Sequence, residues 1–425
     1  MHPIERLRPM PLLCALIGAL YFTPAVAQDA TAVPSTAQAR PSSLATLFEA
    51  AWQRRPEALS LGTRMSAAEA GREAARRWFA EPPAAEVSLR SDRLNRNDGA
   101  REYEAGLAFP LWLPGERALV QRSADAQLGA VSSRARMAQL ETAGMLREAW
   151  WELQRAAVDL DLAETRLDAA RALHGDATRR QRAGQLALTD ANRAGGVLAD
   201  AQSELAGARS KFARARLALQ QLVGRDAALP DAEQLHIEPL PEEAPAIGDS
   251  HPALAALLDE SAMSRSAAVL ASKRSRANPE LTLGVTRERG EAGARFEQTL
   301  TVGIRIPFGG GAQHRSEAGM AMAEAIEHEE RAQLERLRLE SDLLAAREAQ
   351  LAAEARREAT ERRATLAEDT LRAIAKSFRL GETSLPDRLL VELEASEARR
   401  ALAHARIDEA EAISALRQAL GLLPQ

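Results

Sequence analysis

Landmark residues in this sequence recur at a constant spacing of 197 positions. Pro110 is matched by Pro307, and each ends a short apolar segment. Gly184 is matched by Gly381, and each ends a long segment with helical patterning. The same spacing relates three further pairs: Asp190 and Asp387, Gln221 and Gln418, and Gly224 and Gly421. Because so many separate landmarks agree on one spacing, we predict that the chain is a tandem duplication of one structural unit.

The duplication defines the expected organisation of the chain. The two copies are residues 44–224 and 249–425. The segment between them, residues 225–248, is acidic and contains four prolines, which is typical of an irregular linker. Residues 28–43 are rich in Ala, Ser, Thr and Pro and are expected to be flexible.

Residues 1–27 have the features of a secretory signal peptide. Two arginines precede a short apolar run, and an Ala-x-Ala cleavage site follows at Ala25-Val26-Ala27. Cys14, the only cysteine, lies within this segment, so we expect neither disulfides nor thiol chemistry after cleavage. The position of Cys14 early in the apolar run also argues against a lipid anchor. We therefore predict an exported protein.

Each copy contains a long stretch without proline, residues 115–229 and 308–385. In the first, leucine recurs every seven residues and alanine follows three residues after each: Leu146, Leu153, Leu160 and Leu167, with Ala149, Ala156, Ala163 and Ala170. This is the seam of a coiled coil, and the low aromatic content of 4% suits long helices. A helix from Glu116 to Arg182 would be roughly 100 Å long. The seam by itself fits an ordinary soluble coiled coil equally well.

The turns between the long helices are marked by glycine. Gly184 and Gly381 are predicted to end the first helix of each pair, because glycine adopts the left-handed conformation of a helix C-cap at low cost. Ser384 and Asp387 form an S-x-x-D pattern that predicts a capping box at the start of the next helix. Thr189 or Asp190 is expected to cap the corresponding helix of the first copy.

Before each long helix lie two short segments in which apolar and polar residues alternate: Glu86–Arg90 and Tyr103–Pro110 in the first copy, Leu281–Arg287 and Phe296–Pro307 in the second. Alternation of this kind predicts β-strands, joined by charged hairpin loops. We assign Arg90, Arg287 and Arg305 to the polar faces of the strands, where they would line a lumen or form salt bridges within the hairpins.

The strands approach the roughly 9–11 residues of a membrane-spanning strand. Four strands cannot close into a barrel, and open edges are not tolerated in lipid. Two chains would give eight strands, whose interior is filled by side chains, whereas three would give twelve strands around an aqueous lumen. The predicted fold is therefore mainly α with a small β part, in which three chains form a 12-stranded transmembrane β-barrel and an α-barrel. Two small soluble hairpins packed on the helices are the alternative.

With these features, the sequence resembles the TolC family of outer-membrane efflux proteins. The resemblance covers nearly all of the chain after the signal peptide, and it depends on the order of short segments in duplicate: Ser43–Trp52 with Arg55-Pro56, the echo at His251–Leu254, Asn278–Leu281, and the two turns at Gly184 and Gly381. It implies a homotrimer in the outer membrane that extends into the periplasm and docks to a periplasmic adaptor and an inner-membrane pump.

The resemblance also implies a gate at the periplasmic end. Members close this end with residues near the second turn, which are often acidic. Asp387 falls at such a position, Asp190 is its counterpart in the first copy, and Leu390 stands where some members have a second aspartate. Helix capping is the alternative for both aspartates. Two junctions, Pro110–Arg117 and Ile306–Gly311, are loosely similar to the heavy-metal-efflux branch of the family.

The sequence contains no pattern for catalysis. Neither a phosphate-binding loop nor a nucleophile motif is present, the histidines do not cluster, and the balance of 55 basic against 60 acidic residues gives no sign of nucleic-acid binding. We therefore expect no enzyme activity, cofactor or metal site. The predicted function is that of a passive exit duct, and the alternative is a periplasmic coiled-coil or adaptor-like protein without a barrel. The exported compound is not indicated.

Overall fold

The computed structural model describes residues 43–94, 97–225, 227, 229, 237–241, 246–309 and 311–425. The predicted signal peptide lies outside these residues, as do the predicted flexible segment except Ser43 and much of the predicted linker. Within the described part, no helix is long and apolar enough to cross a membrane.

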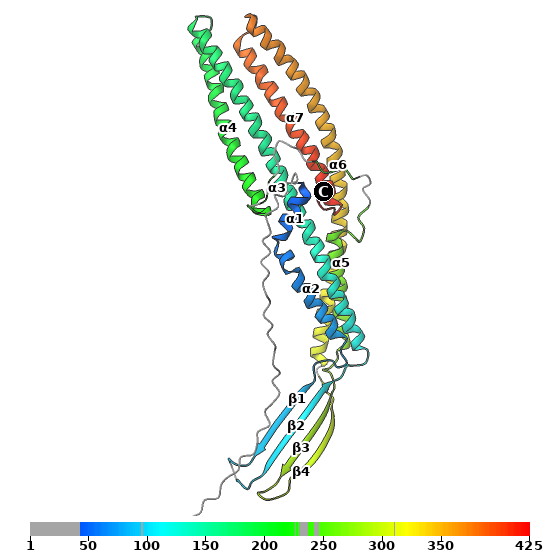
Figure 1. The fold of residues 1–425 in the computed structure, drawn as a ribbon. Helices are drawn as coiled ribbons and strands as arrows, with labels where there is room; N and C mark the ends of the chain where they lie inside the picture. The colour runs from blue at the N-terminus through cyan, green and yellow to red at the C-terminus, as the bar shows by residue number, and fades with distance from the viewer. Residues whose placement is uncertain are drawn as a thin grey trace, which may run out of the picture. The chain divides into compact units, whose positions relative to one another are not determined.

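The same succession of elements occurs twice along the chain (Figure 1). The first comprises α2 (Pro56–Ala75), β1 (Ala84–Ser91), β2 (Arg101–Pro110), α3 (Glu116–Arg182) and α4 (Leu188–Val223). The second comprises α5 (Pro252–Lys273), β3 (Glu280–Arg289), β4 (Glu297–Arg305), α6 (Gly311–Leu380) and α7 (Leu385–Ala419). A short helix, α1 (Leu44–Gln53), precedes the first set. The 67-residue α3 confirms the long helix expected from the leucine seam.

The long helices pack as two antiparallel pairs, α3 with α4 and α6 with α7, and α5 lies against both α3 and α6. The predicted seam forms the contact within the first pair. Its core near the tip consists of Ala163, Leu167 and Ala170 of α3 with Ala201, Leu205 and Ala208 of α4. Alanine on both sides lets the helix backbones approach closely, whereas the leucines fill the remaining space.

Most of the large aromatic side chains in the core gather where α1 covers α3. Trp150 and Trp151 of α3 are each 1% exposed and pack in one cluster with Phe48 and Trp52 of α1. Helix α1 begins at a true cap, because the Ser43 side chain accepts a hydrogen bond from the Thr46 backbone amide. The first repeat therefore has an extra helix that anchors it, and residues 246–251 before α5 form no such helix.

The two turns between the long helices have the predicted glycines in left-handed conformation, with φ of +74° at Gly184 and +82° at Gly381. After each glycine a backbone amide reaches back to the helix: Gln185 donates to the Arg180 carbonyl at 2.9 Å, and Glu382 to Ser377 at 3.1 Å. This is the Schellman arrangement, and it satisfies carbonyls that a helix end leaves free.

The starts of the two returning helices differ. Ser384 caps α7, since its side chain accepts from the Asp387 amide, and its hydroxyl donates to the Asp387 carboxylate at 2.5 Å. The prediction that Thr189 or Asp190 caps α4 is wrong. Helix α4 already begins at Leu188 after Ala187, whose methyl side chain cannot accept a hydrogen bond. Asp190 thus lies in the first helical turn, where a carboxylate favours the helix dipole.

The four strands form one antiparallel sheet in the order β1-β2-β3-β4 (Figure 1). The two hairpins match residue for residue: Val87 lies opposite Ala105 in the first, as Leu283 lies opposite Val302 in the second. Strand β4 ends at Arg305 rather than at Pro307 as predicted. The reason is that Arg305 lies opposite Glu280, the first residue of β3, so that the residues after it have no partner strand.

Candidate functional site

The sheet has one apolar and one polar face. Register places Val87, Leu107, Val285 and Leu300 on the same face, and all four are exposed; Val87 is 83% and Leu300 71% accessible. The other face carries mainly charged, hydroxyl-bearing and small residues, among them Glu86, Ser88, Glu104, Thr286 and Thr301. An uncovered apolar sheet face of this kind marks a surface for contact with another protein, a ligand or a membrane.

The sheet also has two free edges. Within the described part of the chain, β1 and β4 each pair with one strand only, so each presents a row of unpaired backbone amides and carbonyls. Free edges of this length are places where another chain can add a strand.

The three arginines predicted on the polar faces divide between the two faces. Arg90 and Arg305 lie on the polar face and pair with carboxylates, Arg90 with Glu102 at 2.8 Å and Arg305 with Glu280 at 3.5 Å. Arg287 is in phase with Leu283 and Val285 and lies on the apolar face. Its assignment to the polar face is therefore wrong: the alternation of β3 determines its direction, whatever its charge.

The junction between sheet and helices is built around one buried carboxylate. Glu116, at the start of α3, is fully buried. It accepts hydrogen bonds from the Leu113 amide at 3.0 Å, from Asn278 Nδ2 at 2.8 Å and from Arg274 Nε at 2.6 Å. Asn278 and Arg274 come from the second repeat, so this carboxylate joins the two repeats where the strands leave the helices.

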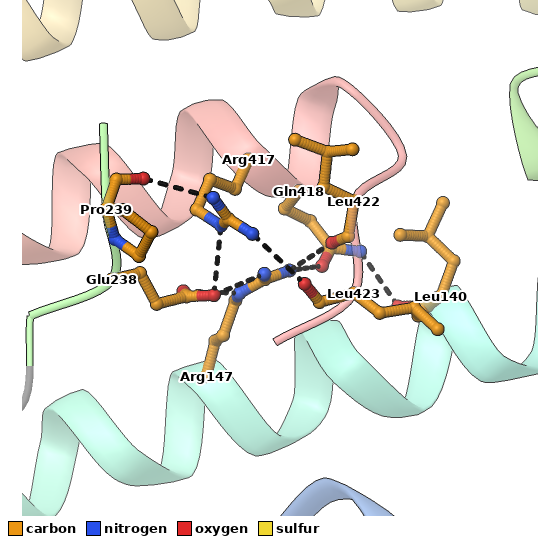
Figure 2. Close-up of polar contacts among 8 residues, drawn as sticks. All are labelled: Leu140, Arg147, Glu238, Pro239, Arg417, Gln418, Leu422 and Leu423. Carbon is orange, nitrogen blue, oxygen red and sulfur yellow. Dashed lines mark hydrogen bonds and ion pairs between the residues drawn. The ribbon is translucent and has the colours of Figure 1, made fainter. Parts of the chain in front are cut away.

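A second polar cluster joins the repeats at the middle of α3 (Figure 2). The guanidinium of Arg147 forms two hydrogen bonds with the Glu238 carboxylate, and its Nη1 donates to Gln418 Oε1 at 2.5 Å. Arg417 donates from Nε to Glu238 at 3.2 Å and from Nη1 to the Pro239 carbonyl at 3.0 Å. Glu238 is 2% exposed and both arginines are 4% exposed. We call these residues, Arg147, Glu238, Arg417 and Gln418, the inter-repeat clamp.

Burial alone would raise the pKa of Glu238. Hydrogen bonds and charge from Arg147, together with Ser414 and Arg417, outweigh this effect and hold the pKa below its ordinary value. The clamp was not predicted from the sequence. The only signal that touched it was the Gln221–Gln418 match, and nothing in the composition of residues 225–248 singled out Glu238.

The two repeats differ in how far matching faces of α3 and α6 are covered. Leu140, Arg147 and Gln154 of α3 are covered, being at most 5% exposed. The duplication matches them with Leu337, Leu344 and Leu351 of α6, and these are 62%, 62% and 56% exposed. A heptad row of leucines on α6 is therefore largely uncovered within the described part of the chain.

Near the tips, a groove of about 450 Å³ lies between α3, α4 and α7. Its apolar lining includes Leu162, Val197, Leu389, Leu390 and Leu393. Leu390, a predicted gate residue, is 57% exposed beside this groove. The other two predicted gate residues have nearby partners: Asp190 pairs with Arg193 at 3.2 Å, and Asp387 accepts from Ser384. Among the described residues, no group of three His, Cys, Asp or Glu side chains could hold a metal ion.

No protein-family model matches this sequence, and no curated protein matches it either. Solved structures do match. The outer membrane protein VceC from Vibrio cholerae superposes with a TM-score of 0.73 and 18% identity, covering 89% of this chain and 96% of that one. The open state of the MtrE outer membrane channel from Neisseria gonorrhoeae gives 0.72 and 18%, covering 89% of each chain.

The CmeC outer membrane channel from Campylobacter jejuni gives a TM-score of 0.71 and 14% identity, covering 89% of this chain and 85% of that one. In all three cases the match extends over both repeats, because so little of either chain is left out. The identities are low, so the likeness is one of architecture. The chain therefore has the fold of the outer membrane protein VceC and of the outer membrane channels MtrE and CmeC.

Proposed function

We propose that this protein is the outer-membrane exit duct of an efflux system, a homotrimer whose sheets join into a 12-stranded barrel. The observation that carries the proposal is the four-stranded sheet with an exposed apolar face and two free edges. In a membrane the apolar face would contact the lipid tails. The backbone amides and carbonyls of the edges would form hydrogen bonds when β4 of one chain pairs with β1 of the next. In this arrangement Arg90 and Arg305 face the lumen.

The internal duplication specifies how these edges would pair. Within the chain, Ala105 of β2 lies opposite Val285 of β3. The repeat counterpart of Ala105 is Val302, at the spacing of 197. The hairpin registers align Val87 of β1 with Leu283 of β3, at a spacing of 196, so the counterpart of Val285 is Leu89. The same contact between chains would place Val302 opposite Leu89 of the neighbour, both on the apolar face. On the polar face this register places Arg305 opposite Glu86, a favourable pair of charges.

The helices support the same assembly. Within the chain, the buried face of α3 packs against α7. Exchange of the repeats would place the uncovered leucines of α6 against α4 of the neighbouring chain.

The tips of the long helices lie far from the sheet. Helix α3 is 67 residues long, so its tip lies roughly 100 Å along the helix axis from the sheet. With the sheet in the outer membrane, the tips reach into the periplasm towards a periplasmic adaptor and an inner-membrane pump. We propose that Asp190, Asp387 and Leu390 narrow the duct there, next to the turns at Gly184 and Gly381. Conduction is passive, and heavy-metal ions are one candidate class of transported compound.

The experiment that tests the function separates membrane insertion from secretion alone. The full-length protein, expressed in a Gram-negative host, should be found in the outer-membrane fraction as an oligomer that resists SDS until heated. Purified in detergent and added to a planar lipid bilayer, it should produce discrete conductance steps. A soluble monomer in the periplasm, or an outer-membrane protein without conductance, would contradict the proposal.

A further inference from the structure

The hairpin end of the apolar face carries three arginines beside two aromatic rings. Register places Arg101, Tyr103, Arg287 and Arg289 on the same face as Val285. Phe296 supports two of the arginines: the Cζ atom of Arg287 is 4.6 Å from the ring centroid, and that of Arg289 is 5.1 Å away. Tyr103 lies next to the same ring, with 6.2 Å between the centroids.

These arginines lack the acidic partners that the polar-face arginines have. Arg90 and Arg305 each form an ion pair with a glutamate of the neighbouring strand. Among the described residues, no carboxylate lies within ion-pair distance of Arg101, Arg287 or Arg289, and Arg289 Nε donates instead to the Gly99 carbonyl at 3.1 Å. The glutamates of this end of the sheet, Glu102, Glu288 and Glu297, are out of phase with the arginines along the strands; they line a pocket with Arg101 and Arg289 at the hairpin end but form no ion pair with them.

The arrangement has an electrostatic cost within the chain. Arg101 lies directly opposite Arg289 in the sheet, and like charges in this position destabilise a strand pair. The cation–π contacts with Phe296 offset part of the cost and hold the guanidinium groups of Arg287 and Arg289 over one ring. A fixed pair of guanidiniums is suited to bidentate hydrogen bonds with phosphate oxygens. The missing negative charge is therefore one that a ligand can supply.

The position of the cluster indicates which ligand. This step rests on the proposed function, in which the apolar face contacts lipid and the hairpin ends point out of the cell. Aromatic rings at the end of an apolar band are typical of the boundary between hydrocarbon and headgroups. Arg101 and Arg289 lie beyond Tyr103 and Arg287 towards the hairpin loops, at headgroup level. The negatively charged groups at that level are the phosphates of membrane lipids.

We infer that Arg101, Arg287 and Arg289, held by Phe296, bind the phosphate of an outer-leaflet lipid on the outside of the barrel. The ligand should carry both a phosphate and an acyl chain. The apolar band directly below the arginines, which includes Val285 and Leu300, would contact the acyl chain. The same strands would thus contact both parts of one lipid. The bound lipid would compensate the Arg101–Arg289 repulsion in every chain.

The test is a lipid titration of the purified full-length oligomer in detergent, read by native mass spectrometry. Lipid A with both phosphates should bind saturably, and lipid A from which the phosphates have been removed should bind at least about tenfold more weakly. The double variant Arg287→Gln/Arg289→Gln should lose binding of the phosphorylated lipid to a similar degree. Arg90→Gln removes a positive charge from the other face of the same end and is the matched control, with a titration equal to the parent's.

Inorganic phosphate in the millimolar range should not compete. Competition would identify the site as one for free phosphate and would overturn the lipid assignment. Equal binding by the double variant, or equal loss in Arg90→Gln, would overturn it as well. Conductance of the same preparations separates the two proposals: a parent that conducts but binds no phosphorylated lipid contradicts only this inference, whereas a parent that forms no channel contradicts the proposed function.

Discussion

Arg147 of α3 donates two hydrogen bonds to the carboxylate of Glu238, from Nε at 2.9 Å and from Nη2 at 2.8 Å. Through this contact, a segment between the repeats is tied to the middle of the first repeat. Arg417 of α7 holds the same carboxylate, so a single glutamate bridges three parts of the chain. Its removal would leave two buried guanidiniums without their counter-charge.

We therefore expect Glu238→Gln to destabilise the protein by about 3–5 kcal/mol, the range seen when one partner of a buried ion pair is lost. The midpoint of unfolding in guanidinium chloride measures the change in stability. Unfolding is followed by the fluorescence of the buried Trp150 and Trp151. Asp168→Asn, which removes an exposed pair with Arg171, is the control and should leave the midpoint unchanged. Equal midpoints for the parent and Glu238→Gln would show that the clamp contributes no stability.

The clamp should also make stability depend on pH. The folded-state pKa of Glu238 lies below its ordinary value, so the clamp stabilises the protein fully above the ordinary carboxyl range. This stabilisation is lost as the pH falls through the lowered pKa. Between neutral and acidic pH, the parent should therefore lose more stability than Glu238→Gln does. Parallel curves of the unfolding midpoint against pH for the two proteins would contradict the lowered pKa.

Two glycines with similar backbone conformations should tolerate alanine differently. Gly381 has φ of +82° and open space where a Cβ would lie, so Gly381→Ala should cost about 1 kcal/mol from backbone strain. Gly421 has φ of +75°, and its Cβ would come within 2.6 Å of Pro252 and 2.8 Å of His251. Gly421→Ala should lower the unfolding midpoint more than Gly381→Ala does; the reverse order would contradict the close approach of Gly421 to His251 and Pro252.

Two variants near the tips distinguish a gating role of Asp387 from a role in capping α7. Asp387→Ala removes a charge from the proposed constriction and should raise single-channel conductance and weaken block by cations. Ser384→Ala removes the cap of α7, at a cost of about 1 kcal/mol, and keeps the charge. Its conductance should equal the parent's. If Asp387→Ala and Ser384→Ala have the same single-channel conductance, Asp387 stabilises the start of α7 and does not narrow the duct.

The proposed pairing between chains predicts a specific cross-link. The double variant Leu89→Cys/Val302→Cys, made in a protein whose only cysteine is Cys14, should form disulfides between chains, because directly opposite residues have Cβ atoms about 4.5–5.5 Å apart. Covalent trimers should appear on non-reducing gels. Val87→Cys/Val302→Cys shifts the pair by two residues and should cross-link poorly. Stronger cross-linking of this second pair would show that the register is different.

Much of the fold is encoded locally and could be predicted. The absence of proline and the seven-residue leucine spacing predicted α3, and the glycines at 184 and 381 predicted the turns. The errors have physical reasons. The charge of Arg287 favours the polar face, but the alternation with Leu283 and Val285 determines its side. The α4 cap was missed because that helix begins at Leu188, one residue before the candidate caps.

The sites were less predictable because they depend on distant contacts. The clamp brings together Arg147, Glu238 and Arg417, and nothing in the local sequence distinguishes these residues from the many other charged ones. The arginine cluster depends on the pairing of β2 with β3, which joins the two repeats. Register between repeats is a tertiary property, so only the structure could place Arg101 opposite Arg289.

The free edges of the sheet belong to different strands, β1 at one side and β4 at the other. A contact between them is head-to-tail and not self-complementary, so a single contact between two copies leaves one edge of each copy unused. Each new chain that joins leaves one edge unused, until the last chain meets the first and the ring closes. An incomplete assembly therefore always retains one exposed strand edge at each end, and only the finished ring has none for lipid to surround.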